Sequence, residues 1–135
     1  MKRATHATGA LPVATEEQEQ AALFEWADIQ KCAYPELGLL YHVPNEGKRS
    51  PRTGARMRAA GLRKGVPDVC LPVARNGSHA LYIELKSRRK GAKATPEQED
   101  WIDALREQGN EAALCYGAAE AIQTIMRYLT GRERA

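Results

Sequence analysis

The sequence predicts an α/β fold in which helices flank a central mixed sheet, with elements in the order αβββαβ and one further helix at the end. Two observations support this prediction. Short apolar runs bounded by glycine, proline or asparagine are typical of strands, and longer segments with helical spacing of apolar residues begin with threonine capping signals. A chain of 135 residues without internal repeats or a linker favours one domain with a sizeable core.

The first helix is expected over residues 15–31, TEEQEQAALFEWADIQK. Thr15 is a suitable N-cap, and the acidic residues that follow it crowd the first turn, where the helix dipole favours negative charge. Leu23 and Trp26 continue one apolar face. We therefore expect the domain to begin at residue 15, after a flexible lead-in of residues 1–14.

Three strands are expected next, over residues 39–43, 69–73 and 81–85. The second and third are joined by ARNGSH, whose Asn76-Gly77 pair is typical of a tight hairpin turn. The segment ARMRAAGLRKG, between the first two strands, is compatible with a short basic helix. The second and third strands should therefore lie side by side.

A helix over residues 95–110 follows, with Thr95 as its N-cap and Gln98 at the position that a capping box uses. A last strand, EAALCYG, and an amphipathic helix, AAEAIQTIMRYLTG, complete the chain. One domain is therefore expected over residues 15–131, with residues 132–135 as a tail.

Three cysteines, Cys32, Cys70 and Cys115, are widely scattered, and there is no CxxC motif and no histidine at ligand spacing. This pattern argues against a disulfide framework and against a zinc site, and favours buried, reduced thiols. No run of 18 apolar residues occurs, and the N-terminal segment lacks the apolar stretch of a signal peptide. We expect a soluble intracellular protein with no membrane partner.

Positive charge is concentrated in the middle of the chain. Residues 48–93 contain thirteen lysine and arginine residues and only two acidic residues, whereas the flanking segments are net acidic. A surface of this kind attracts a polyanion, and nucleic acid is the leading candidate. The alternative for such a cluster is a solvated basic loop.

The two acidic residues of this basic segment, Asp68 and Glu84, lie at the start of one expected strand and within the next. Alternation along a strand places Glu84 and Lys86 on the same face, and the hairpin brings Asp68 close to Glu84. Two carboxylates held together repel each other unless one is protonated or a cation lies between them, and a hard divalent cation is the natural ligand. Lys86 is then placed to orient a water or to stabilise developing negative charge.

Pro67-Asp68, a gap of fifteen residues and Glu84-Leu85-Lys86 together resemble the PD-(D/E)xK signature of the restriction-endonuclease-like nucleases, whose core has the same αβββαβ order. Over residues 15–116 the chain resembles, more closely, the VRR-NUC family. The landmarks are Glu16 and Gln20 on the first helix, Pro44-Asn45 after the first strand, Gly65 to Asp68, Glu84 to Lys86, and Gln98 on the next helix.

The resemblance implies a metal-dependent nuclease. Asp68, Glu84 and the backbone carbonyl of Leu85 would bind Mg²⁺ or Mn²⁺, while Lys86 would assist the attacking water. Gln98 would support the site from its helix. Glu16 would contribute from the first helix, directly or through water, to the same metal or a second one. In-line attack of water on a phosphodiester requires no covalent intermediate.

The basic segments on either side of this site are expected to hold DNA phosphates, which positions a backbone without reading its sequence. No recognition helix or zinc finger is recognisable, so structure-selective cleavage is expected. The expected DNA-contacting residues are Asn45, Lys48, Arg49, Arg52, Arg56, Arg58, Arg63, Lys64, Arg88, Arg89 and Lys90.

Free-standing members of the VRR-NUC family, often from phages or bacteria, are implied to act as homodimers on branched DNA such as four-way (Holliday) junctions. The resemblance therefore places the protein in the cytoplasm of a bacterial cell or of a phage-infected host. A symmetric junction requires two symmetric sites, and one chain supplies one. The last helix, with Ile122, Ile125, Met126 and Leu129, is a candidate interface, although burial against its own sheet is the other use of this stripe.

Each assignment on the helices has a structural alternative. Glu16 and Glu19 both lie on the face of Leu23 and Trp26, and either is also a partner for the helix dipole. Gln98 is also a capping residue.

The strand and loop residues have alternatives as well. Asp68 is also typical of a turn at a strand start, and Lys86 of a surface ion pair with Glu84. Asn45 is also an ordinary loop residue. At the level of function, the alternatives are a non-catalytic nucleic-acid-binding module of the same fold and a nuclease that prefers flaps, nicks, single strands or RNA.

Overall fold

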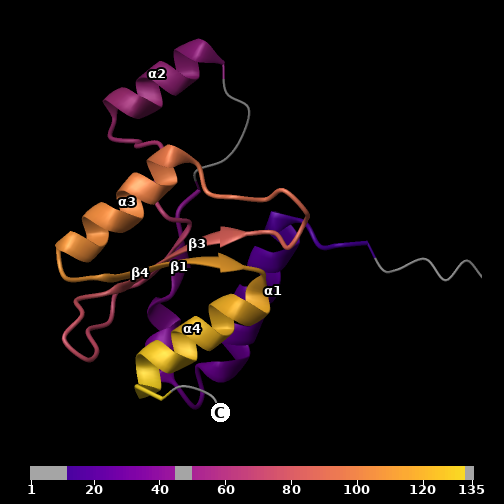
Figure 1. Cartoon of the computed structure of the whole chain (residues 1–135), viewed down its shortest axis with the longest axis vertical. Helices are drawn as coiled ribbons and strands as arrows, with labels where there is room; N and C mark the ends of the chain where they lie inside the picture. The colour runs from indigo at the N-terminus through magenta and orange to yellow at the C-terminus, as the bar shows by residue number, and fades with distance from the viewer. Residues whose placement is uncertain (1–11, 45–49, 133–135) are drawn as a thin grey trace, which may run out of the picture.

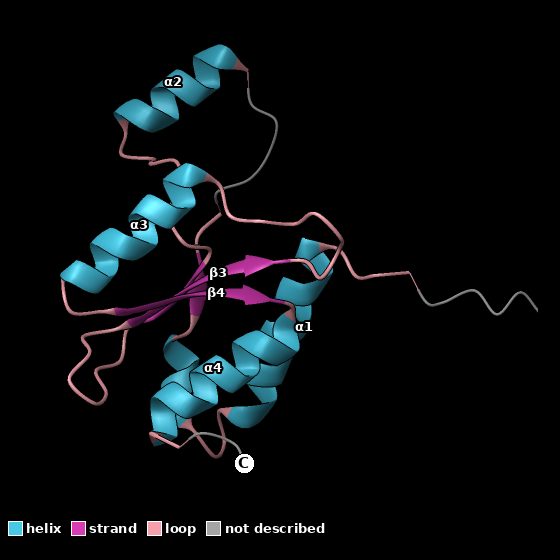
Figure 2. Ribbon diagram, in the orientation of Figure 1, coloured by secondary structure: helices cyan, strands magenta, loops and turns pink. Residues whose placement is uncertain are grey.

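The computed structural model describes residues 12–44 and 50–132, and within these ranges it contains a four-stranded sheet in the order β1-β2-β3-β4 (Figures 1 and 2). β1 pairs antiparallel with β2, β2 antiparallel with β3, and β3 parallel with β4. The expected mixed sheet and the αβββαβ order are confirmed. The strands are β1 (Tyr41–His42), β2 (Val69–Leu71), β3 (Leu81–Lys86) and β4 (Glu111–Tyr116).

Helices cover both faces of the sheet, as Figure 1 shows. α1 and α4 pack against each other on one face, and α3 lies against β4 on the opposite face. α2 stands apart from the sheet, beyond the N-terminal end of α3. The helices are α1 (Glu16–Gln30), the 3-10 helix η1 (Pro35–Leu39), α2 (Pro51–Ala59), α3 (Pro96–Glu107) and α4 (Ala118–Thr130).

Capping boxes fix where α1 and α3 begin. The Thr15 hydroxyl accepts a hydrogen bond from the backbone N–H of Gln18, and the Gln18 side chain accepts one from the N–H of Thr15. Thr95 and Gln98 repeat this arrangement at α3. Each box satisfies two backbone donors that a helix start leaves without an intrahelical partner.

The hairpin between β2 and β3 turns at Asn76 and Gly77, both with positive φ (47° and 82°). This combination matches the type I′ turn that Asn-Gly pairs favour. β2 ends at Leu71, earlier than the sequence suggested, because Pro72 has no N–H to donate to a ladder. β1 begins at Tyr41 instead of residue 39, because Leu39 belongs to the 3-10 helix η1.

Alternation along β3 divides its side chains between the two faces. Leu81, Ile83 and Leu85 are at most 1% exposed and belong to the core that packs against α1 and α4. Glu84 and Lys86 therefore point to the opposite face, on which α3 packs. Other buried members of the core are Leu23, Ala27, Leu37, Leu40, Val69, Leu71, Val73, Cys115, Ala118, Ala121, Ile125 and Tyr128.

The apolar stripe of α4 is used largely within the chain. Ile125 is fully buried, and Ile122 and Leu129 pack partly buried against the core. Among the cysteines, Cys70 and Cys115 are buried and free, but Cys32 is exposed. The expectation of a buried Cys32 is wrong because this residue lies in the turn after α1, beyond the helix that packs on the sheet. Within the described ranges, no helix is long and apolar enough to cross a membrane.

Candidate functional site

Asp68 and Glu84 lie next to each other on neighbouring strands. Val69 is the partner of Ile83 in the β2–β3 register, so the residue before Val69 lies across from the residue after Ile83. Both carboxylates are buried, with 6% of Asp68 and 1% of Glu84 exposed. The backbone N–H of Leu85 donates to Asp68 Oδ2 at 3.0 Å, which fixes the Asp68 side chain against β3.

Glu84 has different surroundings at its two oxygens. Its Oε1 accepts a hydrogen bond from Gln98 Nε2 at 2.7 Å and lies 3.5 Å from Lys86 Nζ. Its Oε2 is buried and has no hydrogen-bond partner among the described residues. A buried carboxylate oxygen in that condition is costly, since burial removes water that it would otherwise bind.

Burial and, next, the neighbouring charge of Asp68 raise the pKa of Glu84 to about 8, although Lys86 opposes both effects. The Lys86 side chain is itself only 12% exposed, so its charge acts at close range in a poorly solvated position. Without a cation between the carboxylates, Glu84 therefore holds a proton near neutral pH.

Gln98 combines two functions at the start of α3. Its Oε1 accepts from the backbone N–H of Thr95 at 2.8 Å, and its Nε2 donates to Glu84. The capping box orients the Gln98 amide: because the amide oxygen is bound to the N–H of Thr95, the amide nitrogen is left to face Glu84. Both the capping alternative and the contact with Glu84 are thus present in one side chain.

The segment before Asp68 is held against the start of α3. A Cβ on Gly65 would lie 2.7 Å from the carbonyl carbon and oxygen of Glu97, and Gly65 has φ +93°. Trp101 Nε1 donates to the Lys64 carbonyl at 3.0 Å, and Lys64 forms an ion pair with Glu97 at 3.3 Å. Only glycine fits this approach, so the glycine of the Gly-x-Pro-Asp motif sets the position of the strand that follows.

Lys86 ends β3 beside Tyr116, its register partner on β4. The N–H of Gly117 donates to the Lys86 carbonyl at 2.8 Å, which extends the pairing past the strand end. Tyr116 was not singled out from the sequence. The one feature of the sequence that could have indicated its place near the site is the strand alternation, which puts it on the face of α3.

Glu19, the alternative to Glu16, is engaged in a network on the other side of the sheet. Its Oε1 accepts from Arg88 Nη2 at 2.9 Å and Nε at 3.2 Å, and its Oε2 accepts from the N–H of Ala118 at the start of α4. Glu19 is 5% exposed. It therefore ties α1 to the end of β3 and to α4, a structural function that the sequence did not reveal.

Glu16 lies in the first turn of α1 and is partly exposed. Over residues 12–44 and 50–132, no three His, Cys, Asp or Glu side chains form a group that could hold a metal ion. Glu16 therefore does not complete a three-carboxylate group with Asp68 and Glu84.

The Asp68–Glu84 pair fits a hard divalent cation on the basis of its donors. It offers carboxylate oxygens from two adjacent strands, one of them Glu84 Oε2, to which no group in the described part of the chain donates a hydrogen bond. Mg²⁺ and Mn²⁺ prefer oxygen ligands, and Mg²⁺ sites in proteins commonly use only one or two carboxylates with water or substrate phosphate completing the shell. A cation there would remove the repulsion that raises the pKa of Glu84.

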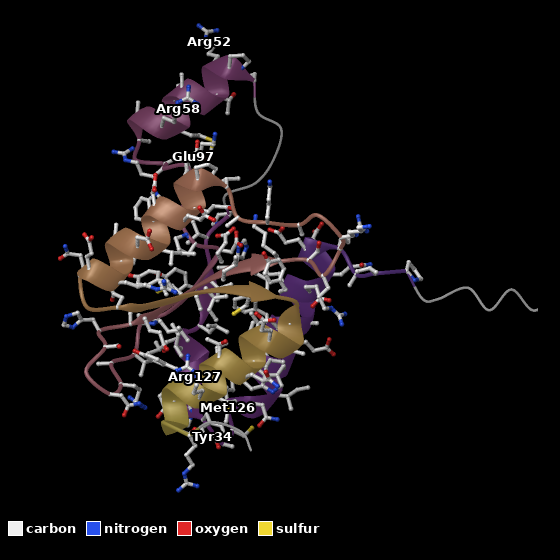
Figure 3. The ribbon with its side chains drawn as sticks, viewed as in Figure 1. Tyr34, Arg52, Arg58, Glu97, Met126 and Arg127 are labelled. Atoms are coloured by element: carbon white, nitrogen blue, oxygen red, sulfur yellow. The ribbon has the colours of Figure 1, made fainter. Side chains whose placement is uncertain are left out.

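Basic residues of the expected DNA-contacting set fall into two groups. Arg52, Arg56 and Arg58 are exposed on α2, which has no buried residue, and Figure 3 shows Arg52 and Arg58 there with Glu97 at the nearby start of α3. Exposed Arg63 and Lys64 follow this helix. Arginines on a projecting helix are free to meet a phosphate backbone.

The second group follows β3. Arg88 is bound to Glu19, although its side chain is still 61% exposed. Arg89 donates to the Val13 carbonyl at 3.4 Å, and Lys90 is exposed. Asn45, Lys48 and Arg49 lie outside the described residues.

A cavity of about 640 Å³ lies elsewhere, between the hairpin turn and the C-terminal ends of α3 and α4. Three of its lining residues are arginines with partners in the protein: Arg75 pairs with Glu36, Arg127 pairs with Glu111, and Arg106 donates to the Ala112 carbonyl. Neither carboxylate of the Asp68–Glu84 pair lines this cavity, and we attribute its polar lining to packing of the sheet edge.

Comparison with known proteins gives a consistent result. The family model of the VRR-NUC domain matches residues 14–119. A solved structure described as a VRR_NUC domain protein superposes with a TM-score of 0.77 at 27% sequence identity, covering 90% of this chain and 93% of that chain. No curated protein matches.

Proposed function

The chain belongs to the VRR-NUC domain family, within the restriction-endonuclease-like nuclease superfamily, and from this premise we propose that it is a metal-dependent endonuclease that cuts branched DNA. Membership implies a nuclease-type function on DNA, and nucleases of this kind typically use a divalent metal. The metal, the sites and the choice of branched substrate are the proposal.

The observation that supports the proposal most strongly is the buried Asp68–Glu84 pair, in which Glu84 Oε2 has no hydrogen-bond partner within residues 12–44 and 50–132. A fold gains nothing in stability from two adjacent buried carboxylates, because each raises the free energy of ionising the other. Perturbed acids of this kind concentrate at functional sites. The ammonium of Lys86, 3.5 Å from Glu84 Oε1, adds a positive charge on the same face.

Asp68, Glu84 and the Leu85 carbonyl would hold Mg²⁺ or Mn²⁺. When bound, the metal supplies Lewis-acid polarisation of a phosphoryl oxygen and lowers the pKa of a coordinated water. The residues supply positioning. The N–H of Leu85 holds Asp68, and Gln98 holds Glu84, so both carboxylates are oriented before any ligand arrives.

Lys86 is proposed to act on the reacting groups directly. Its ammonium donates hydrogen bonds, and its burial beside Glu84 keeps it in one place. It is suited to orient the attacking water and to stabilise the negative charge that grows on the phosphate oxygens. Glu16 is proposed to assist from α1 through water.

Binding is proposed to depend on phosphate contacts. The exposed arginines of α2 and the basic residues after β3 lie on separate segments that both lead into the site residues, one before Asp68 and one after Lys86. Contacts of this type carry no base sequence, which favours recognition of DNA structure. Asn45, Lys48 and Arg49 belong to the same proposal.

Residues 15–131 are proposed to form one nuclease domain, and two copies are proposed to act together on a four-way junction. A two-fold symmetric junction presents two equivalent scissile bonds, and a homodimer matches that symmetry. The partly exposed residues of α4, including Ile122 and Met126, are the proposed contact; Figure 3 shows Met126 beside Arg127 on this helix.

The proposal is tested by cleavage of labelled four-way junction, flap, linear duplex and single-stranded DNA with Mg²⁺, Mn²⁺ or EDTA. Wild type is compared with Asp68→Asn and Lys86→Ala. Matched controls are Asp28→Asn and Lys31→Ala, an exposed ion pair at the end of α1. We expect metal-dependent cleavage by wild type and both controls, with both site variants binding DNA but not cutting it.

Two outcomes would replace the proposal. Binding of junctions without cleavage in any metal would identify a non-catalytic DNA-binding module, whose affinity would depend on salt but not on divalent ions. Faster cleavage of flaps, nicks, single strands or RNA than of junctions would retain the nuclease and change its substrate.

A further inference from the structure

A row of side chains crosses the sheet beside the Asp68–Glu84 pair. Cys70 on β2 is the register partner of Tyr41 on β1 and of Tyr82 on β3. Cys70 and Tyr82 lie two residues from Asp68 and Glu84 respectively, so all four side chains point to the same face. Two residues along a strand correspond to about 7 Å. The tyrosines therefore form the row next to the carboxylates.

The row is open to solvent at one end. Tyr41 is 49% exposed, while Cys70 is 2% exposed and Tyr82 is partly buried. α3 lies on this face but packs against β4, at the opposite edge of the sheet from β1. An aromatic ring thus stands accessible at the β1 edge, on the face that carries the proposed catalytic groups.

The side chain of Tyr41 is uncharged at physiological pH. Interaction with the Cys70 side chain, together with partial burial, raises the pKa of Tyr41 to about 12. The phenol therefore stays neutral at physiological pH and does not repel a nucleic acid. In the register, Cys70 lies between Tyr41 and Tyr82 and pairs with both.

We propose that Tyr41, supported by Cys70 and Tyr82, is a stacking site for one unpaired nucleobase of the DNA strand whose phosphate lies at Asp68 and Glu84. This inference rests on the proposed nuclease function and adds a determinant of substrate choice. Aromatic rings stack any base, but a base inside a duplex is already stacked on its neighbours and cannot reach the ring. Strands at branch points and flaps supply unpaired bases.

The proximity of the carboxylates identifies the occupant as nucleic acid. A substrate phosphate at Asp68 and Glu84 places the adjoining nucleotides of that strand within reach of the next row on the same face. Along β3, the row of Tyr41, Cys70 and Tyr82 lies on one side of the carboxylates and Lys86 lies on the other side. The site thereby gains a contact that distinguishes unpaired from paired DNA.

The test is fluorescence quenching of 2-aminopurine, placed at successive positions in the unpaired arm of a DNA flap and in a fully paired duplex, in EDTA. Wild type is compared with Tyr41→Leu, which removes the ring but keeps an apolar side chain, and Tyr41→Phe, which keeps the ring. Ile29→Ala, an exposed apolar position on α1 that is 65% exposed, is the control.

Wild type, Tyr41→Phe and Ile29→Ala are expected to quench the probe at one position of the flap and not in the duplex. Tyr41→Leu is expected to lose that quenching and to bind the flap about 10-fold or more weakly, with duplex affinity unchanged. Unchanged duplex affinity also shows that this variant is folded.

Three results would overturn the inference. The first is retention of both quenching and flap affinity by Tyr41→Leu. The second is equal weakening of flap and duplex binding by that variant. The third is a Tyr41→Leu protein whose molecular mass falls from that of a dimer to that of a monomer while quenching is unchanged, which would assign the surface to a protein contact. The assay needs no cleavage, so a protein that quenches at Tyr41 but does not cut DNA would refute the nuclease and keep the stacking site.

Discussion

Replacing Glu84 by glutamine is expected to abolish cleavage while stabilising the metal-free fold at neutral and alkaline pH. The side chain is 1% exposed, and its pKa is raised to about 8 by burial and by Asp68. The amide that replaces it keeps the shape of the carboxylate. Its oxygen can accept from Gln98, and its nitrogen can donate to Asp68.

The direction of the pH effect follows from the two pKa values of Glu84. In the unfolded chain the carboxyl titrates near the ordinary value of 4.5, and in the fold near 8, so the folded state binds the proton more tightly. The stability that the fold gains by binding this proton is complete below the pKa of Glu84 in the unfolded chain. It is lost as pH rises through about 8, the pKa in the folded state. At about 1.4 kcal/mol per pKa unit, the loss amounts to several kcal/mol.

The assay is urea unfolding in EDTA at a series of pH values, for wild type, Glu84→Gln and Glu25→Gln. Glu25 is an exposed glutamate on α1 and serves as the matched control. Titrations of groups distant from Glu84 cancel in the difference between variants. The Glu84→Gln variant should match wild type near about pH 4 and exceed it by several kcal/mol above about pH 8, whereas Glu25→Gln should follow wild type throughout.

Addition of Mg²⁺ at alkaline pH is expected to stabilise wild type and not Glu84→Gln, because only the folded wild type binds the ion. A Glu84→Gln variant that is less stable than wild type at alkaline pH in EDTA would refute the reasoning. So would a difference between the two proteins that does not change with pH.

Three further perturbations have defined outcomes. Gly65→Ala should lower the free energy of unfolding by about 1–3 kcal/mol and reduce cleavage, since φ is +93° and Glu97 occupies the space that the new Cβ would need. Calorimetry that shows wild-type stability for this variant would contradict this. Glu19→Ala should lower the free energy of unfolding by about 3 kcal/mol, because it leaves the Ala118 N–H without its acceptor. Glu17→Ala, at an exposed position, is the control, and equal melting temperatures of the two variants would refute the buried network. Arg58→Ala should weaken binding to all DNA structures alike and reduce the salt slope by about 1, whereas an effect confined to one DNA structure would contradict a phosphate contact.

Local signals in the sequence were sufficient for most of the fold. Thr95 with Gln98 marked the start of α3, and the Asn76-Gly77 pair marked the hairpin that brings two distant acids together. These features depend on hydrogen bonds between residues close in sequence, so short motifs determine them. Strand ends were less predictable: β1 begins at Tyr41 and not at residue 39, because Leu39 belongs to the 3-10 helix η1, which the sequence did not predict.

The candidate site was predictable in part for the same reason. The hairpin and strand alternation place Asp68, Glu84 and Lys86 on one face, and the structure brings them together with Gln98. Glu19 could not be assigned, because its partners Arg88 and Ala118 are far away in sequence and meet it only after α1 and α4 pack. Tyr41 and Tyr116, the register partners of Cys70 and Lys86, likewise emerge only from the order of the strands.

The measurement that tests the central claim most directly is a calorimetric titration of Mn²⁺ into wild type, Asp68→Asn and the control Asp28→Asn, at neutral pH, where Glu84 is still protonated. The account predicts saturable binding by wild type and by Asp28→Asn, with release of a proton from Glu84, and loss of that binding in Asp68→Asn. Equal Mn²⁺ affinity in all three proteins would show that the buried carboxylate pair does not hold the metal and would contradict the account.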